Sequence, residues 1–237
     1  MEEYEQDGYT YLRECGCGER QRKIMQGKIE FASIPESFKE LRLNSFATSV
    51  YKQTVSKQCI AKSCKLIKGW LDNLERMKTE GMGLYLYSQT KGSGKTRMAT
   101  SIGNELIFEK HMQVKFATSL QIVNEIKACW DEESELSEST LLNYLIRSEV
   151  LILDDFGTEH IKDWIQDKFY HIINSRYVNR KITIFTSNMD LNNLKYDERI
   201  TNRIKERCFV IPFPEESVRE HIAEDKMHEL RKLVGME

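Results

Sequence analysis

The feature that most constrains this chain is a glycine-rich segment, KGSGKT, at residues 91–96. It follows a short apolar run at residues 84–87 and precedes a stretch in which Met98, Ile102 and Leu106 recur every four residues. The first pattern is typical of a strand and the second of an amphipathic helix. A glycine-rich turn between a strand and a helix is the context in which a phosphate-binding P-loop forms. We therefore expect an α/β fold.

The residue types in this segment suit a nucleoside triphosphate and its metal ion. Turn amides and the positive end of the following helix attract phosphate oxygens. The Lys95 amine is expected to reach the β- and γ-phosphates, and the Thr96 hydroxyl to ligate Mg²⁺. The alternative is a surface turn that binds nothing. The predicted nucleotide-binding residues here are Lys91, Gly92, Ser93, Gly94, Lys95 and Thr96.

The segment departs from the usual spacing GxxxxGK[ST] at its first position, where this chain has Gln89. Gly92 and Gly94 keep the tight part of the turn. A glutamine can leave a strand in an extended conformation, but it adopts a left-handed one at a higher cost than glycine does. We interpret the segment as a variant P-loop, and the effect of Gln89 on nucleotide affinity stays open.

Length and charge limit the class of protein. The 237 residues suffice for one domain of ordinary size with an appendage. No apolar run reaches the roughly 18 residues of a membrane span, and the first residues do not resemble a signal peptide. We therefore expect a cytoplasmic protein that does not associate with membranes. The net charge is −2, so any nucleic acid would be bound by local patches.

The cysteines do not form a recognisable metal or disulfide framework. Cys15 and Cys17 lie close together, but a zinc site needs four ligands, and the next cysteines are Cys59 and Cys64. We expect reduced thiols in preference to a zinc site, and metal binding by Cys15 and Cys17 stays open as the alternative.

Two segments have an unbalanced charge. Residues 41–71 contain six cations and no acid, with Lys62, Lys65 and Lys68 at every third position. They form either a solvated helix face or a surface that contacts phosphates. Residues 131–138 carry five acids, which predicts a solvated loop or a loop that faces a partner.

A second phosphate-chemistry motif, EVLILDDFG, occupies residues 149–157. A continuous apolar run is typical of a parallel strand buried on both faces, and such sheets bind ligands at the carboxyl ends of their strands. Asp154 is expected to hold Mg²⁺, and Asp155 to orient and polarise the attacking water. On its own, this pattern could also mark an ordinary end of a strand.

Polar residues after two later elements extend the predicted site. Asn188 follows a strand expected at residues 181–186 and could bond the attacking water or the γ-phosphate, although a lone Asn is more often a turn residue. Arg199, Arg203 and Arg207 recur every four residues on an expected helix. An arginine there could meet a neighbouring subunit's triphosphate. The alternative is pairing with nearby acids, namely Asp197, Glu198 and Glu206.

Taken in order, these motifs resemble the AAA+ helicase loaders of the DnaC/DnaI type, especially their phage-encoded relatives. The resemblance spans roughly residues 30–220. It implies a three-layer α/β/α core with a five-stranded, mostly parallel sheet in the order 5-1-4-3-2. The motifs that carry it are IPESF at 34–38 with Phe46, GSGKT at 92–96, LILDDFG at 151–157, INSRY at 173–177, TIFTSN at 183–188, and Arg199-Ile200 through Arg203-Ile204.

The resemblance also assigns roles to single residues, with ATP and Mg²⁺ as the bound groups. Asp155, Asn188 and Arg203 are the implied catalytic residues. The full assignment is Walker A at Lys95 and Thr96, Walker B at Asp154 and Asp155, sensor 1 at Asn188, the arginine finger at Arg203 and sensor 2 at Arg219.

The implied function is the loading of a replicative helicase. Such loaders bind single-stranded DNA and deliver a DnaB-like hexameric helicase in a bacterial or phage-infected cell. We expect slow ATP hydrolysis, stimulated by DNA or by the partner, to drive release, and self-association through the AAA+ interface. Residues 1–45 are predicted to bind the helicase and residues 46–237 to form the ATPase domain. An IstB-like transposition ATPase and a non-hydrolysing adaptor that binds a helicase stay open as alternatives.

Overall fold

A computed structural model describes residues 2–6, 9–13, 19–130, 137–159 and 161–235. Cys15, Cys17 and most of the acidic segment, residues 131–136, lie outside the described residues. Near the N-terminus, β1 (Glu2–Gln6) pairs with β2 (Tyr9–Arg13) in an antiparallel hairpin. Within the described part of the chain, no helix is long and apolar enough to cross a membrane.

The core of the protein is a five-stranded sheet in which every pairing is parallel. Its order is β4-β5-β6-β3-β7. Numbered within this sheet alone, and counted from the β7 edge, that order is 5-1-4-3-2, so the expected topology is confirmed. The strands are β3 (Gly83–Tyr87), β4 (Val114–Thr118), β5 (Val150–Asp154), β6 (Ile182–Ser187) and β7 (Cys208–Pro212).

Burial along the strands follows their position in the sheet. Every residue of β5 and β6 is buried, which explains the nearly continuous apolar sequence of β5. The edge strand β7 instead exposes Phe209 and Val210. Consecutive side chains of a strand point to opposite faces, so Leu84 and Leu86 of β3 join one hydrophobic core while Tyr85 joins the other.

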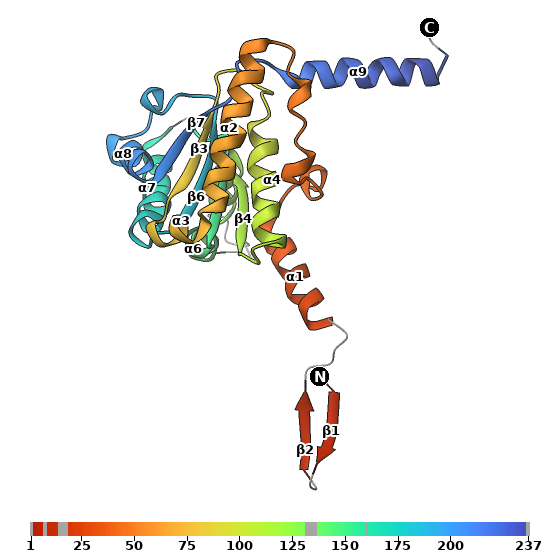
Figure 1. Ribbon diagram of the computed structural model, residues 1–237. Helices are drawn as coiled ribbons and strands as arrows, with labels where there is room; N and C mark the ends of the chain where they lie inside the picture. The colour runs from red at the N-terminus through yellow and green to blue at the C-terminus, as the bar shows by residue number, and fades with distance from the viewer. Residues whose placement is uncertain (1, 7–8, 14–18, 131–136, 160, 236–237) are drawn as a thin grey trace.

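Helices cover both faces of the sheet and complete three layers (Figure 1). On the face that includes Leu84 lie α1 (Glu19–Ala32), α2 (Thr54–Asp72), α3 (Leu74–Glu80) and α4 (Lys95–Phe108). On the face that includes Tyr85 lie α5 (Ser119–Ala128), α6 (Glu138–Arg147), α7 (Asp163–Val178) and α8 (Glu198–Arg207). The last helix, α9 (Val218–Leu233), projects away from the sheet (Figure 1).

Local sequence signals account for several helix starts. Thr118 caps α5, because its hydroxyl oxygen accepts a hydrogen bond from the Gln121 amide at 3.1 Å. Ser137 caps α6 in the same way through Thr140, at 3.2 Å. Trp70 of α2 and Leu74 of α3 are buried and hold these two helices on the core.

Part of the N-terminal region packs on the sheet domain. Ala32 and Ile34 belong to the same hydrophobic core as α4. Three short 3₁₀ turns follow, η1 (Glu36–Phe38), η2 (Leu43–Ser45) and η3 (Thr48–Val50). The Asn104 side chain of α4 donates hydrogen bonds to the carbonyl oxygens of Phe38, at 2.8 Å, and Leu41, at 2.9 Å. Residues 19–45 therefore contribute to the core, and the helicase-binding role of residues 1–45 stays a prediction.

The arginine of the INSRY motif has a structural position. Arg176 is 1% exposed, and its guanidinium donates to the carbonyl oxygens of Leu145 at 2.7 Å, Ser148 at 3.0 Å and Ile182 at 2.5 Å. Burial lowers the pKa of Arg176 to about 9. These bonds tie the segment before β5 to the start of β6, and so help to set the two strands whose ends form the site.

Candidate active site

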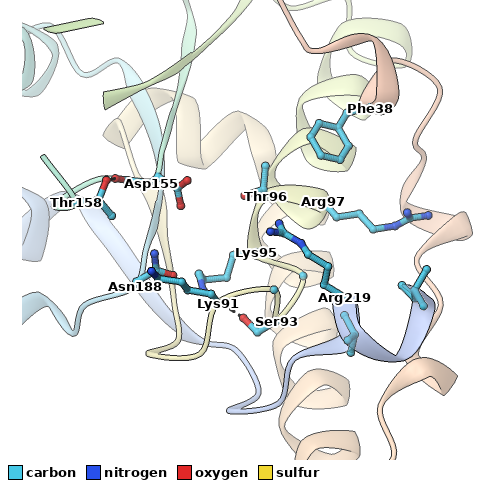
Figure 2. Close-up of a pocket in the computed structure, with 14 residues that line it drawn as sticks. Phe38, Lys91, Ser93, Lys95, Thr96, Arg97, Asp155, Thr158, Asn188 and Arg219 are labelled. Atoms are coloured by element: carbon cyan, nitrogen blue, oxygen red, sulfur yellow. Dashed lines mark hydrogen bonds between the residues drawn. The ribbon is translucent and has the colours of Figure 1, made fainter. Parts of the chain in front are cut away.

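A cavity of about 500 Å³ opens at the carboxyl ends of the strands (Figure 2). The P-loop, residues 91–96, forms one wall. Asp155, Thr158 and Asn188 form a second, and residues from η1 and α9 complete the lining. The volume falls in the range of small-molecule sites. The polar residues predicted at the ends of β3, β5 and β6 thus converge on one space.

Two glycines of the P-loop are required by its conformation. Gly92 has φ +78° and Gly94 has φ +95°, values that cost little only for glycine. A Cβ on Gly94 would lie 2.8 Å from the Tyr51 hydroxyl oxygen. The same hydroxyl donates a 2.7 Å hydrogen bond to the Ser93 carbonyl, so Tyr51 supports the loop from behind. The loop is a tightly held cradle and not a free surface turn.

Lys95 extends through the inside of this cradle. Its amine is buried and donates to the carbonyl oxygens of Ser88 at 3.1 Å and Thr90 at 3.0 Å, and to the Ser93 hydroxyl at 3.2 Å. Burial lowers the pKa of Lys95, and the nearby carboxylate of Asp155 opposes that shift. Neutral oxygens hold a cation here, and phosphate oxygens would be stronger acceptors.

The metal-ligand pair predicted from the sequence is in direct contact. The Thr96 hydroxyl donates to Asp154 Oδ1 at 2.9 Å, and Thr186 of β6 donates to the same oxygen at 2.6 Å. Asp154 is 4% exposed. Its burial, and then the charge of Asp155, raise the pKa of Asp154, while the two hydroxyl bonds partly offset the rise. A hydroxyl and a carboxylate are oxygen ligands of the kind Mg²⁺ prefers, so these residues fit a magnesium–nucleotide complex.

Asp155 has a left-handed backbone, φ +52°, directly after β5. Its amide donates to the Thr186 hydroxyl at 3.0 Å, and its carbonyl accepts from the Ser119 and Thr158 hydroxyls at 2.9 and 2.8 Å. This bonding directs the carboxylate into the cavity, across from Lys95 (Figure 2). Asn188 lines the same side. Both residues therefore line the same cavity as the P-loop, and their roles in catalysis stay predictions.

Arg219 is also brought to the site. It lies in the first turn of α9 and extends toward Lys95 and Thr96 (Figure 2). Phe38 and Arg97 line the cavity as well. Phe38 was apparent in the sequence only as part of the IPESF motif, and Arg97 only as the residue after the P-loop motif.

Arg203 is not among the residues that line this cavity. Its guanidinium donates to Asn174 Oδ1 at 2.7 Å and lies 5.0 Å from the centre of the Tyr170 ring. Of the alternative acid pairings, the one between Arg199 and Asp197 is present, at 3.0 Å. The α8 arginines therefore lie on a different surface from the P-loop, and a role in a neighbouring subunit stays a prediction.

The strand order, the P-loop and the Asp154–Thr96 pair together define an AAA+ P-loop ATPase domain. Residues 84–224, more than half of the chain, match the family model described as "IstB-like ATP binding protein". The chain belongs to this IstB-like ATP-binding family.

Curated relatives from Bacillus subtilis include the protein YqaM, a phage-like element protein and a replicative helicase loader. The chain is 25% identical to YqaM over 205 residues, 84% of this chain and 62% of YqaM. It is 26% identical to the PBSX phage-like element protein XkdC over 210 residues, 86% of this chain and 74% of XkdC. It is 33% identical to the replicative helicase loader DnaI over 121 residues, 49% of this chain and 36% of DnaI. The match thus spans less than two thirds of YqaM and of DnaI.

Solved structures share the fold. A DnaC helicase loader superposes with a TM-score of 0.63 at 24% identity, covering 76% of this chain and 100% of that one. DnaI superposes with a TM-score of 0.61 at 23% identity, covering 77% of this chain and 95% of that one. These likenesses confirm the AAA+ architecture.

Proposed function

We propose that this protein is an ATP-dependent helicase loader that binds single-stranded DNA and delivers a DnaB-like replicative helicase. One observation carries the proposal. The ATPase residues converge on a single cavity, in a chain whose relatives include named replicative helicase loaders. Hydrolysis of ATP would drive release from the helicase, slowly unless DNA or the partner is bound.

The residues of the cavity divide the chemical work. Lys95 and the P-loop amides bind the phosphates, and Arg219 adds a cation from α9. Thr96 and Asp154 hold Mg²⁺, which when bound neutralises charge on the phosphates. Asp155 accepts a hydrogen bond from the attacking water and so orients it, and Asn188 fixes the position of that water. These are positioning and electrostatic roles, and phosphoryl transfer depends chiefly on such contributions.

Arg203 would act on a neighbouring subunit. An arginine supplied across an interface stabilises charge that develops on the transferred phosphoryl group. Its aromatic and amide neighbours hold the guanidinium on the surface, and no acid within the described residues forms an ion pair with it. Self-association would then be needed for full activity.

The test combines turnover with partner capture. Phosphate release by the wild-type chain should require Mg²⁺ and rise when single-stranded DNA is added, and Lys95→Ala should abolish it. Affinity capture with the tagged chain should recover the replicative helicase. Capture with tagged Lys95→Ala is the control that shows whether this binding depends on nucleotide. Turnover that Lys95→Ala leaves unchanged would reject the site.

The family match favours one second candidate, a helper ATPase for transposition. Its core would hydrolyse ATP in the same way, but capture would recover a transposase in place of a helicase. A non-hydrolysing adaptor would capture the helicase without releasing phosphate. The two assays together separate all three functions.

A further inference from the structure

Gln89 and Thr90, which lead from β3 into the P-loop, are held by a residue that no sequence motif marks. Glu215 lies between β7 and α9, far along the chain from the loop. One carboxylate oxygen accepts the Gln89 amide at 2.9 Å, and the other accepts the Thr90 amide at 2.8 Å. The Thr90 hydroxyl donates to that second oxygen at 2.8 Å. Three donors from the variant part of the loop therefore converge on one side chain.

These contacts explain how the loop tolerates Gln89. Between residues 88 and 96, Gly92 and Gly94 alone have positive φ angles. Position 89 therefore keeps a backbone conformation that glutamine can adopt. Glu215 bonds the amide of Gln89 and not its side chain. The carboxylate thus fixes the backbone at the position where the usual motif has glycine. Hydrogen bonds to an ionised acceptor are stronger than neutral ones, so this attachment is a firm one.

The same segment attaches α9 to the loop at two further points. The Ser88 hydroxyl donates to the Pro214 carbonyl at 2.9 Å, and the Val218 amide donates to the Gly92 carbonyl at 3.1 Å. A Cβ on Gly92 would lie 3.0 Å from Arg219 Cβ. Residues 214–219 therefore run against the loop from Ser88 to Gly92, and the cation of Arg219 is placed by the same contacts.

We propose that Glu215 is a positioning residue for phosphate binding. Its carboxylate holds the first half of the variant P-loop in its binding shape and fixes α9, with Arg219, against it. The inference rests on the proposed ATPase function and adds a residue to it. Because Glu215 acts through the loop and not on the nucleotide base, its loss should weaken binding of phosphates and leave the base unaffected.

The test uses the full chain and the fluorescent nucleotide MANT-ATP, with ATP, ADP and adenosine as competitors. Glu215→Ala should raise the dissociation constants of ATP and ADP about tenfold, the effect expected for losing one charge-assisted attachment. That of adenosine should stay within about twofold of wild type, since P-loop amides contact only phosphates. The ATP dissociation constant of Glu215→Gln should lie between those of the wild type and Glu215→Ala, because the glutamine amide keeps one acceptor oxygen. Glu220→Gln removes an equivalent charge from the first turn of α9 and should bind as wild type does.

Steady-state kinetics separates positioning from a general loss of folding. If Glu215 positions the loop, the variant should show a raised KM and a kcat close to wild type, because saturating ATP restores the loop. A merely structural role would instead lower kcat and the melting temperature together and weaken adenosine binding as much as ATP binding, which would overturn the inference. Equal ATP affinity in Glu215→Ala and wild type would also overturn it. Failure of the wild type itself to bind MANT-ATP would reject the proposed function, and this inference with it.

Discussion

Replacing Asp154 by asparagine should stabilise the protein and inactivate it. Asp154 is 4% exposed, and both Thr96 and Thr186 donate to the same oxygen, Oδ1. Asparagine retains a carbonyl oxygen for these two bonds and removes the buried negative charge. Since burial raises the pKa of Asp154, the ionised form is disfavoured in the folded protein.

The size and sign of the effect follow from this burial. Replacing one active-site residue that disfavours folding commonly adds about 1 kcal/mol to the free energy of unfolding. For a chain of this length, that gain raises the melting temperature by about 2–4 °C. A folded-state pKa above the ordinary value of 3.8 means that the wild type loses stability as the pH rises through that folded-state pKa. The gain in the free energy of unfolding of Asp154→Asn over the wild type should therefore be full at about pH 7.5 and small below about pH 4.

Thermal unfolding without nucleotide measures this directly, with Asp72→Asn as the exposed control. The control should melt as the wild type does at both pH values. Added Mg²⁺ and ATP should raise the melting temperature of the wild type and have a much smaller effect on Asp154→Asn, which should also release no phosphate. A variant that melts at or below the wild-type temperature near neutral pH would refute the claim that this buried charge is a cost to folding.

Three further substitutions test other parts of the account. Gly94→Ala should reduce ATP affinity at least tenfold in a binding titration, because φ is +95° and the added Cβ meets the Tyr51 hydroxyl; near wild-type affinity would contradict the geometry. Arg176→Met should lower the free energy of unfolding in urea by about 3 kcal/mol, since it leaves several buried carbonyl oxygens without a donor, and a loss under about 1 kcal/mol would argue against the structural role. Mixing inactive Lys95→Ala with inactive Arg203→Ala should restore part of the phosphate release, and no recovery would count against an arginine supplied between subunits.

The sequence was sufficient to predict the sheet and the centre of the site. Strand and helix periodicities are local and predicted the elements, whereas the strand order was implied by the resemblance to the DnaC/DnaI-type loaders. The carboxyl ends of parallel strands meet at one edge, so the approach of Asp154 to Thr96 could be expected before any contact was known. The observed 2.9 Å hydrogen bond between them agrees with that expectation.

The residues that support the site were harder to predict. Thr186 and Glu215 act through tertiary contacts with Asp154 and with the loop, and neither contact leaves a periodic pattern in the sequence. Gln89 was identified as a departure from the motif, but the compensating carboxylate lies 126 positions away. Arg176 belonged to a recognised motif, yet only the fold shows that its guanidinium is buried among backbone carbonyls.

The central claim is that Lys95 and the Asp154–Asp155 pair act on one nucleotide in this cavity. The most direct measurement is steady-state phosphate release from ATP by wild type, Lys95→Ala and Asp155→Asn at equal folded concentration. The account predicts Mg²⁺-dependent release by the wild type and none above background by either variant. Release that persists undiminished in Lys95→Ala would contradict it.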